Sequence, residues 1–128
     1  MPPPARRPTV LIVEDDVPLR DMYRSALKVA GYEVGGVDDG LDALRWIEEH
    51  TPDAIVLDLI LPRLGGRDVH SELQTRAETR SIPIVIVTGD DAADIPASEL
   101  CVVLQKPVEP HTLVDTVSRC IRRHGRAV

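Results

Sequence analysis

Each of four short apolar runs in the chain is followed, directly or after one intervening residue, by a residue that could bind or receive a phosphoryl group. These residues are, in turn, an acidic group, a single carboxylate, a hydroxyl and an amine. The runs and the residues after them are Val10–Val13 with Glu14, Asp15 and Asp16; Ala54–Leu57 with Asp58; Ile84–Val87 with Thr88; and Cys101–Leu104, through Gln105, with Lys106. Carboxylates and phosphate oxygens are ligands that Mg²⁺ prefers, and a carboxylate can also take a phosphoryl group covalently. If the runs are neighbouring parallel strands, these side chains meet at one edge of a sheet.

Strand-like and helix-like segments alternate along the chain. The strand-like segments are Val10–Val13, Glu33–Val37, Ala54–Leu57, Ile84–Val87 and Cys101–Leu104. The inner segments are almost wholly apolar, which is typical of a parallel sheet covered by helices on both faces. We therefore predict the α/β class, with a doubly wound, five-stranded parallel sheet whose ligand site lies beyond the carboxyl ends of the strands.

Capping residues and apolar periodicity predict where the helices begin. Asp16 is a candidate N-cap for the first helix, and Asp38 or Asp39 opens the second. The third helix comes after the loop 62–66 and carries Leu73 and Ala77 on its apolar face. A last amphipathic helix comes after the final strand.

Length and composition fit one globular domain. The chain has 128 residues, of which 43% are hydrophobic and 28% are charged, and this is enough for one core but not for two. We expect residues 1–8 to form a flexible N-terminal tail, residues 9–125 the domain and residues 126–128 a C-terminal tail. The net charge of −6 argues against direct nucleic-acid binding, and no apolar run is long enough to cross a membrane.

The N-terminal segment and the cysteines bear on the compartment. Residues 1–8 contain arginines but no apolar stretch after them, unlike a signal peptide. Cys101 lies in a strand-like run and Cys120 on a helix-like face, and both are expected to stay reduced thiols. We therefore predict a cytoplasmic protein.

Four motifs together resemble the receiver domain of two-component response regulators, in its single-domain, CheY-like form. They are VLIVEDD at 10–16, VLDLILPRLGG at 56–66, Thr88-Gly89 and Lys106-Pro107. The resemblance covers roughly residues 9–123, and its order and spacing make it more specific than any single motif. It implies the flavodoxin-like strand order.

The resemblance implies a role for each polar residue at a strand end. Asp58 would be the phosphoacceptor, Lys106 would contact the phosphoryl oxygens, and Thr88 would bond another oxygen and move toward it. The Lys106–Pro107 peptide bond would be cis. The phosphoryl group would come from a sensor histidine kinase or a phosphotransfer protein, and altered protein–protein interaction with an unknown downstream protein would carry the signal. Apart from self-phosphorylation and autodephosphorylation, no enzymatic activity is implied.

The resemblance also implies Mg²⁺ as the cofactor. Asp15 would bind the ion directly and Glu14 through water, while Asp58 and the backbone carbonyl of Ile60 would complete the protein ligands. Magnesium sites in proteins combine a few carboxylates with phosphate oxygens and waters. Three clustered carboxylates repel one another without a cation, so this donor set needs one.

Each of these residues also has a purely structural interpretation. Asp16 is better explained as a helix cap than as a ligand, and Asp15 alone could be a cap too. Taken singly, Asp58 could form a turn, Thr88 could be a strand-end hydroxyl and Lys106 a solvated charge. At the level of function, the alternatives are an interaction module that works without phosphorylation and, less favoured, a magnesium-dependent phosphohydrolase. The hydrolase class usually has a second Asp two residues after the nucleophile, where this chain has Ile60.

Two features depart from the family pattern. The position three residues before the lysine usually carries an aromatic residue, and here it is Val103, which excludes an aromatic rotamer switch. The segment from Asp90 to Glu99 is short and acidic and has no clear apolar stripe. We therefore predict that the helix between the fourth and fifth strands is short or irregular, and that the partner-binding face is nonstandard.

Overall fold

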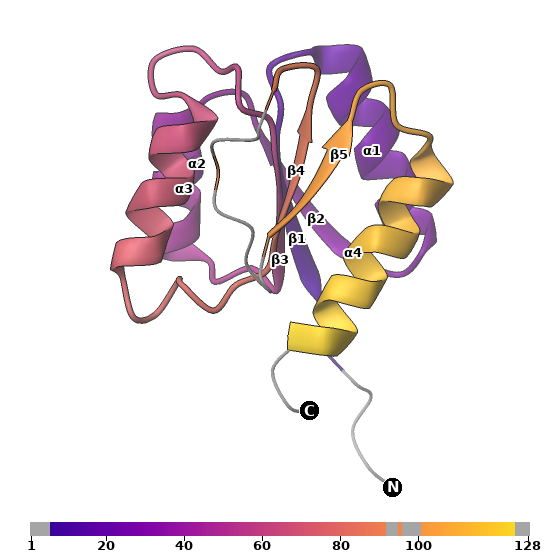
Figure 1. Cartoon of the computed structure of the whole chain (residues 1–128). Coiled ribbons are helices and arrows are strands. Elements are labelled where there is room, and N and C mark those ends of the chain that lie inside the picture. Colours follow the sequence, from indigo (N-terminus) through magenta and orange to yellow (C-terminus); the bar gives the residue numbers. More distant parts are fainter. Residues whose placement is uncertain (1–5, 92–94, 96–100, 125–128) are drawn as a thin grey trace, which may run out of the picture.

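The computed structural model describes residues 6–91, 95 and 101–124, and the described part of the chain forms one parallel sheet between two layers of helices (Figure 1). The strands are β1 (Thr9–Val13), β2 (Glu33–Val37), β3 (Ala54–Leu57), β4 (Ile84–Thr88) and β5 (Cys101–Gln105). The helices are α1 (Val17–Val29), α2 (Gly40–Glu49), α3 (Gly66–Thr75) and α4 (Pro110–His124). All five predicted strands are confirmed.

The strands lie in the order β2-β1-β3-β4-β5, and all neighbouring pairs are parallel. The connection from β1 leads to β2 on one side of it, and the next connection crosses to β3 on the other side of β1. The direction in which strands are added therefore reverses at β1. This is the predicted doubly wound, flavodoxin-like topology. The register pairs Val13 with Leu57 and Leu57 with Ile86. Residues just after these positions therefore leave the sheet at nearly the same level.

The two faces of the sheet form two apolar layers because successive strand residues point to opposite sides. Helices α2 and α3 cover one face, and α1 and α4 cover the other (Figure 1). In β1, Leu11 and Val13 pack toward the first layer, and Val10 and Ile12 pack toward the second. Burial on both sides explains why the inner strands are apolar throughout.

Aspartate side chains cap two of the helices, as predicted. Asp16 accepts a hydrogen bond from the Leu19 backbone N–H at 3.1 Å and begins α1. Of the two candidates for α2, Asp39 is the cap, because it accepts from the Asp42 N–H at 2.8 Å. Asx side chains at this position satisfy one of the free N–H groups of the first turn.

The prediction that Ala77 lies on the apolar face of α3 is wrong. The helix ends at Thr75, and Ala77 is exposed. The buried residue is Thr79, whose hydroxyl donates to the Leu73 carbonyl oxygen at 2.7 Å. The Leu73 carbonyl also accepts from the Arg76 backbone N–H at 3.4 Å, so both bonds meet at the end of α3.

The predicted short or irregular helix between β4 and β5 lies outside the described residues, except for Asp90, Asp91 and Ile95. The nonstandard partner-binding face therefore stays a prediction. The domain limits and the tails stay predictions too, although Arg6 forms an ion pair with Asp53 at 3.1 Å.

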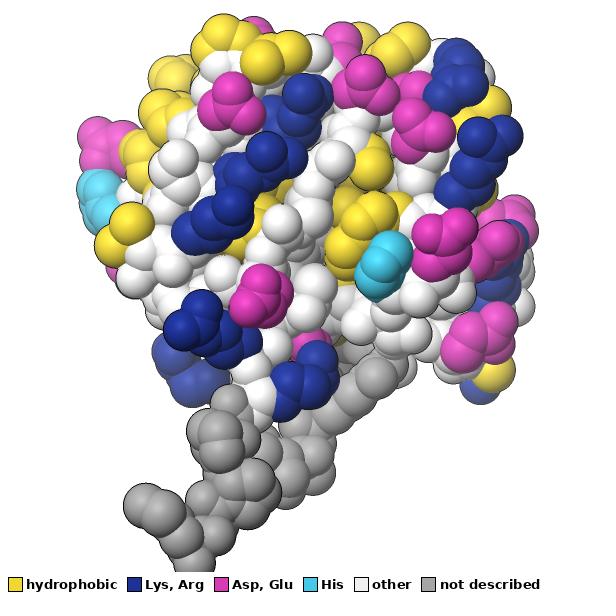
Figure 2. Space-filling view, turned by 180° about the vertical axis from the view of Figure 1, so that it is seen from behind, with side chains coloured by type: hydrophobic (Ala, Val, Ile, Leu, Met, Phe, Trp, Pro, Cys, Tyr) yellow, Lys and Arg dark blue, Asp and Glu magenta, His cyan; other side chains and the backbone are white. Residues whose placement is uncertain are grey.

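The described surface carries charges of both signs. On the face shown in Figure 2, Lys and Arg side chains are interspersed with Asp and Glu side chains.

No helix among the described residues combines the length and the apolar character needed to cross a membrane.

Candidate functional site

The structure brings together the polar residues predicted at the strand ends. Glu14 comes directly after β1, Asp58 after β3 and Lys106 after β5, while Thr88 ends β4. Two backbone hydrogen bonds extend the sheet into this region: the Asp58 N–H donates to the Val13 carbonyl at 3.1 Å, and the Lys106 N–H donates to the Thr88 carbonyl at 2.9 Å. Parallel pairing thus aligns two carboxylates, a hydroxyl and an amine at one edge.

Lys106 joins the two buried carboxylates of the site. Its Nζ lies 2.8 Å from Glu14 Oε1 and 3.0 Å from Asp58 Oδ2. Glu14 is only 2% exposed and Asp58 only 5%. A carboxylate removed from water needs a charged or hydrogen-bonding partner, and the single ammonium group serves both. The Lys106–Pro107 peptide bond is cis, as predicted.

The environment changes the pKa of two of these groups. Burial raises the pKa of Glu14, and the hydrogen bonds from Lys106 and from the Asp16 backbone offset only part of that effect. Burial alone would lower the pKa of Lys106, but its hydrogen bonds to Glu14 and Asp58 outweigh it and raise that pKa. Lys106 therefore remains a cation, surrounded by more acidic groups than it can neutralise.

The acidic residues have the composition of a magnesium site. Carboxylate oxygens of Glu14, Asp15 and Asp58 all lie within 4.8 Å of one another, and Asp15 is exposed at the surface. A set made only of oxygen donors, partly open to water, fits a hard divalent cation. Ile60 lies beside this group, since its N–H donates to Asp58 Oδ1 at 3.2 Å. Its side chain is 60% exposed.

A hollow of about 390 Å³ opens above Asp58. Asp58, Ile60, Gly89, Asp90 and Lys106 line it. Thr88 is fully buried just beneath this lining, and its Oγ1 accepts a hydrogen bond from the Asp90 N–H at 3.1 Å. The hollow is large enough for a phosphoryl group next to the carboxylate of Asp58 and the amine of Lys106.

Sequence reasoning missed two kinds of residue that support the site. Gly66 begins α3, and a Cβ at this position would overlap the Asp58 carbonyl oxygen, so only glycine permits this approach. The glycine pair after the Pro62 loop was the available signal. Arg67, the next residue, contacts Asp90 and Asp91, which lie 23 and 24 residues further along the chain, and nothing in the local sequence indicates these contacts.

A second group of three carboxylates lies just beyond β2. Asp38, Asp39 and Asp42 also have oxygens within 4.8 Å of one another. Here Arg63 donates from Nε and Nη2 to Asp39 Oδ2, at 2.8 and 2.5 Å. Among the described residues these are the two acidic groups with such spacing.

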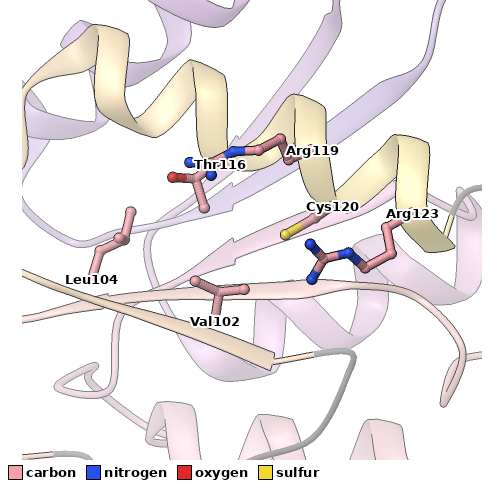
Figure 3. Close-up of a pocket in the computed structure, with 6 residues that line it drawn as sticks. All are labelled: Val102, Leu104, Thr116, Arg119, Cys120 and Arg123. Atoms are coloured by element: carbon pink, nitrogen blue, oxygen red, sulfur yellow. The ribbon is translucent and has the colours of Figure 1, made fainter.

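A second hollow, of about 160 Å³, lies between β5 and α4 and shares no lining residue with the hollow above Asp58 (Figure 3). Cys120 points from α4 toward the sheet there, flanked by Arg119 and Arg123. Its thiol is free, and burial raises the pKa of that thiol. Val103, the position without an aromatic residue, is 39% exposed on β5.

Comparison with known proteins connects this arrangement to one family. The family model described as the response regulator receiver domain matches residues 10–118. The chain is 34% identical over 121 residues to the phosphate regulon transcriptional regulatory protein PhoB of Pseudomonas aeruginosa. That match covers 91% of this chain and 53% of PhoB, so the chain spans about half of this relative.

Solved structures agree with the sequence matches. A putative response regulator from Chloroflexus aurantiacus is 34% identical, with a TM-score of 0.83, and the match covers 92% of this chain and all of that one. The receiver domain of the sensor histidine kinase PA1611 from Pseudomonas aeruginosa is 28% identical, with a TM-score of 0.81. The match covers 91% of this chain and 99% of that one, and the PA1611 structure has a magnesium ion coordinated in its active site cleft.

Proposed function

The chain belongs to the family of response regulator receiver domains, and from that premise we propose that Asp58 is its phosphoacceptor. Domains of this family are signalling modules of two-component systems that interact with histidine kinases or phosphotransfer proteins. The observation that carries the proposal is the carboxylate of Asp58, buried at the base of an open hollow and bonded to Lys106 at 3.0 Å.

In the proposed reaction, an oxygen of the Asp58 carboxylate attacks the phosphorus of a phosphohistidine on the partner. The new P–O bond forms an acyl phosphate, the P–N bond breaks, and the electron pair stays on the imidazole nitrogen of the donor. The Ile60 N–H holds Asp58 Oδ1 at 3.2 Å and so fixes the orientation of the carboxylate. Lys106 offers its positive charge to the phosphoryl oxygens on the same side.

We propose Mg²⁺ as the cofactor, held by Asp15, by Asp58, by the backbone carbonyl of Ile60 and, through water, by Glu14. When bound, the ion would neutralise charge on the transferring phosphoryl group. The cluster of Glu14, Asp15 and Asp58 supports this assignment because it contains more carboxylates than Lys106 can balance.

Thr88 would convert phosphorylation into a change of shape. Its Oγ1 now accepts from the Asp90 N–H. That bond does not use the hydroxyl proton, which Thr88 would donate to a phosphoryl oxygen by moving toward it. The Thr88–Asp91 loop would then rearrange and alter binding to a downstream protein. No aromatic side chain stands at Val103 to report that movement, so the loop itself would carry it. We expect this signalling in the cytoplasm.

The test is incubation with acetyl phosphate, with and without Mg²⁺, followed by intact-mass measurement. We expect a gain of one phosphoryl group that requires Mg²⁺ and is absent in Asp58→Asn. Asp39→Asn, which also removes a buried carboxylate, serves as the matched control and should gain the group normally. No gain in a folded, magnesium-containing sample would contradict the proposal and favour an interaction module that works without phosphorylation.

A further inference from the structure

The loop after β4 is held from several sides at the rim of the Asp58 hollow. The Asp90 N–H donates to Thr88 Oγ1 at 3.1 Å, and the Gln105 side-chain amide lies 3.5 Å from the Asp90 carbonyl oxygen. Arg67, in the first turn of α3, reaches the same loop with both ends of its guanidinium group. Its Nη2 donates to the Asp91 carbonyl at 2.6 Å, and its Nη1 lies 3.5 Å from Asp90 Oδ2.

Asp90 introduces a negative charge where an anion must enter. It lines the hollow together with Asp58 and Lys106. A phosphodonor carries negative charge of its own, and Lys106 is already shared between Glu14 and Asp58. A carboxylate free to turn into this hollow would repel the donor and compete for the ammonium group.

We propose that Arg67 is a positioning residue for phosphoacceptance: it holds the Asp90 carboxylate at the rim and neutralises it, so that Lys106 remains available to the incoming phosphoryl group. The inference rests on the proposed role of Asp58 and adds a residue that determines how readily that role is performed. Arg67 suits the task because its guanidinium can bind a carboxylate and a backbone carbonyl at once.

The ion pair is too exposed to serve mainly the stability of the fold. The side chains of Arg67 and Asp90 are 37% and 47% exposed, and pairs of this kind contribute little to folding. Their charges nevertheless act on an anionic donor that enters the hollow lined by Asp90. Exposed charges near such a site change the rate of phosphorylation and make that rate depend on salt. The effect should therefore appear in the kinetics of phosphorylation.

The experiment measures the rate of phosphorylation by acetyl phosphate with saturating Mg²⁺, at low and at high salt. The variants are Arg67→Ala, Arg67→Lys, Asp90→Asn and the double variant Arg67→Ala/Asp90→Asn. Arg80→Ala is the matched control, because it removes one positive charge before β4, at the opposite edge of the sheet. Thermal unfolding of every variant checks the fold.

We expect Arg67→Ala to react roughly three- to tenfold more slowly than wild type at low salt, with the gap closing at high salt. Arg67→Lys should keep most of the rate, Arg80→Ala all of it, and the double variant should recover because no carboxylate remains to be held. An unchanged rate in Arg67→Ala, or a double variant as slow as Arg67→Ala, would overturn the inference about Arg67 and leave the role of Asp58 standing. Failure of the wild type to gain a phosphoryl group would overturn both.

Discussion

Glu14, Asp15 and Asp58 form one acidic cluster, and Asp38, Asp39 and Asp42 form another of the same size and spacing. Both lie beyond the carboxyl ends of strands, and each contains a nearly buried aspartate bonded to one basic side chain. The two clusters differ in the groups that bind the carboxylate oxygens. This difference distinguishes a candidate reaction site from a cluster whose role is structural.

In the second cluster, folding has already used both oxygens of Asp39. Oδ1 accepts from the Asp42 N–H and caps α2, while Oδ2 accepts two N–H groups from Arg63. Arg63 Nη2 also lies 3.2 Å from Asp42 Oδ1. The backbone of Arg63 has a φ of 63°, a conformation that few residues other than glycine adopt. The planar guanidinium therefore already binds Asp39 Oδ2 and lies against Asp42, where a metal ion or another cation would otherwise bind.

In the first cluster, the basic partner is the ammonium group of Lys106, which has no planar, forked guanidinium. The Lys106 ammonium contacts Glu14 and Asp58 from one side, Asp15 is exposed, and a hollow opens above Asp58. The number and spacing of carboxylates therefore do not identify a metal site. Asp58 and Asp39 are equally buried, and both oxygens of each accept hydrogen bonds. The distinguishing features are the hollow lined by Asp58 and the ammonium group that takes the place of a guanidinium.

Replacing the basic residue of each cluster should produce the largest difference between the two clusters in the rate of phosphorylation. Lys106→Met is expected to slow phosphorylation of Asp58 by about 10²-fold or more, because it removes the positive charge that faces the phosphoryl oxygens. Arg63→Met should leave that rate within about twofold and lower the melting temperature instead. The rates come from intact-mass time courses, with circular dichroism in Mg²⁺ to check the fold. Equal loss of rate in both variants would contradict the distinction.

Magnesium affinity should separate the clusters next. Asp15→Asn is expected to weaken Mg²⁺ binding by about tenfold or more, because it removes the negative charge of the exposed residue proposed to coordinate the ion directly. Asp38→Asn, a matched change in the other cluster, should have no effect. Mg²⁺ raises the melting temperature according to its affinity for the folded state, so thermal unfolding over a magnesium titration measures both. A stronger effect of Asp38→Asn would place the metal in the second cluster instead.

Much of this arrangement could be predicted from the sequence, and the limits have physical causes. The strands and the convergence of Glu14, Asp58 and Lys106 were predictable because apolar runs and the polar residues after them are local patterns. The choice between Asp38 and Asp39 as the helix cap was not, since either could reach the first turn. The contact between Arg67 and Asp90 joins separate segments, and no local pattern marks it.

Stability should show the opposite ranking of the two clusters. Asp39→Ala is expected to cost about 1–2 kcal/mol in the free energy of unfolding, because it removes both a helix cap and the Arg63 bonds. Asp15→Ala should leave stability unchanged or raise it slightly, since it relieves repulsion among neighbouring carboxylates. Denaturant unfolding of both variants without Mg²⁺ gives the comparison. A larger loss in Asp15→Ala would show that the first cluster, too, is structural.

The smallest expected effect is a dependence on acid. Burial alone would raise the pKa of Asp39, but hydrogen bonds from the Asp42 backbone and from Arg63 outweigh it and hold that pKa below its usual value. The folded state therefore binds fewer protons than the unfolded state, and the contribution of Asp39 is present above about pH 4 and lost as the pH falls further. Asp39→Asn keeps the cap, so its stability deficit relative to wild type should be constant above about pH 5 and shrink toward zero as the pH falls below about 4. A deficit independent of pH would contradict this assignment.

The central claim is that Asp58, the carboxylate that lines the open hollow beside Lys106, receives the phosphoryl group, rather than any other acid at this edge. Borohydride reduces an aspartyl phosphate to homoserine, which peptide mass spectrometry can locate after treatment with acetyl phosphate and Mg²⁺. We predict homoserine at Asp58 and at no other acidic residue. Homoserine at Asp15, at Asp39 or at any other carboxylate would contradict the account.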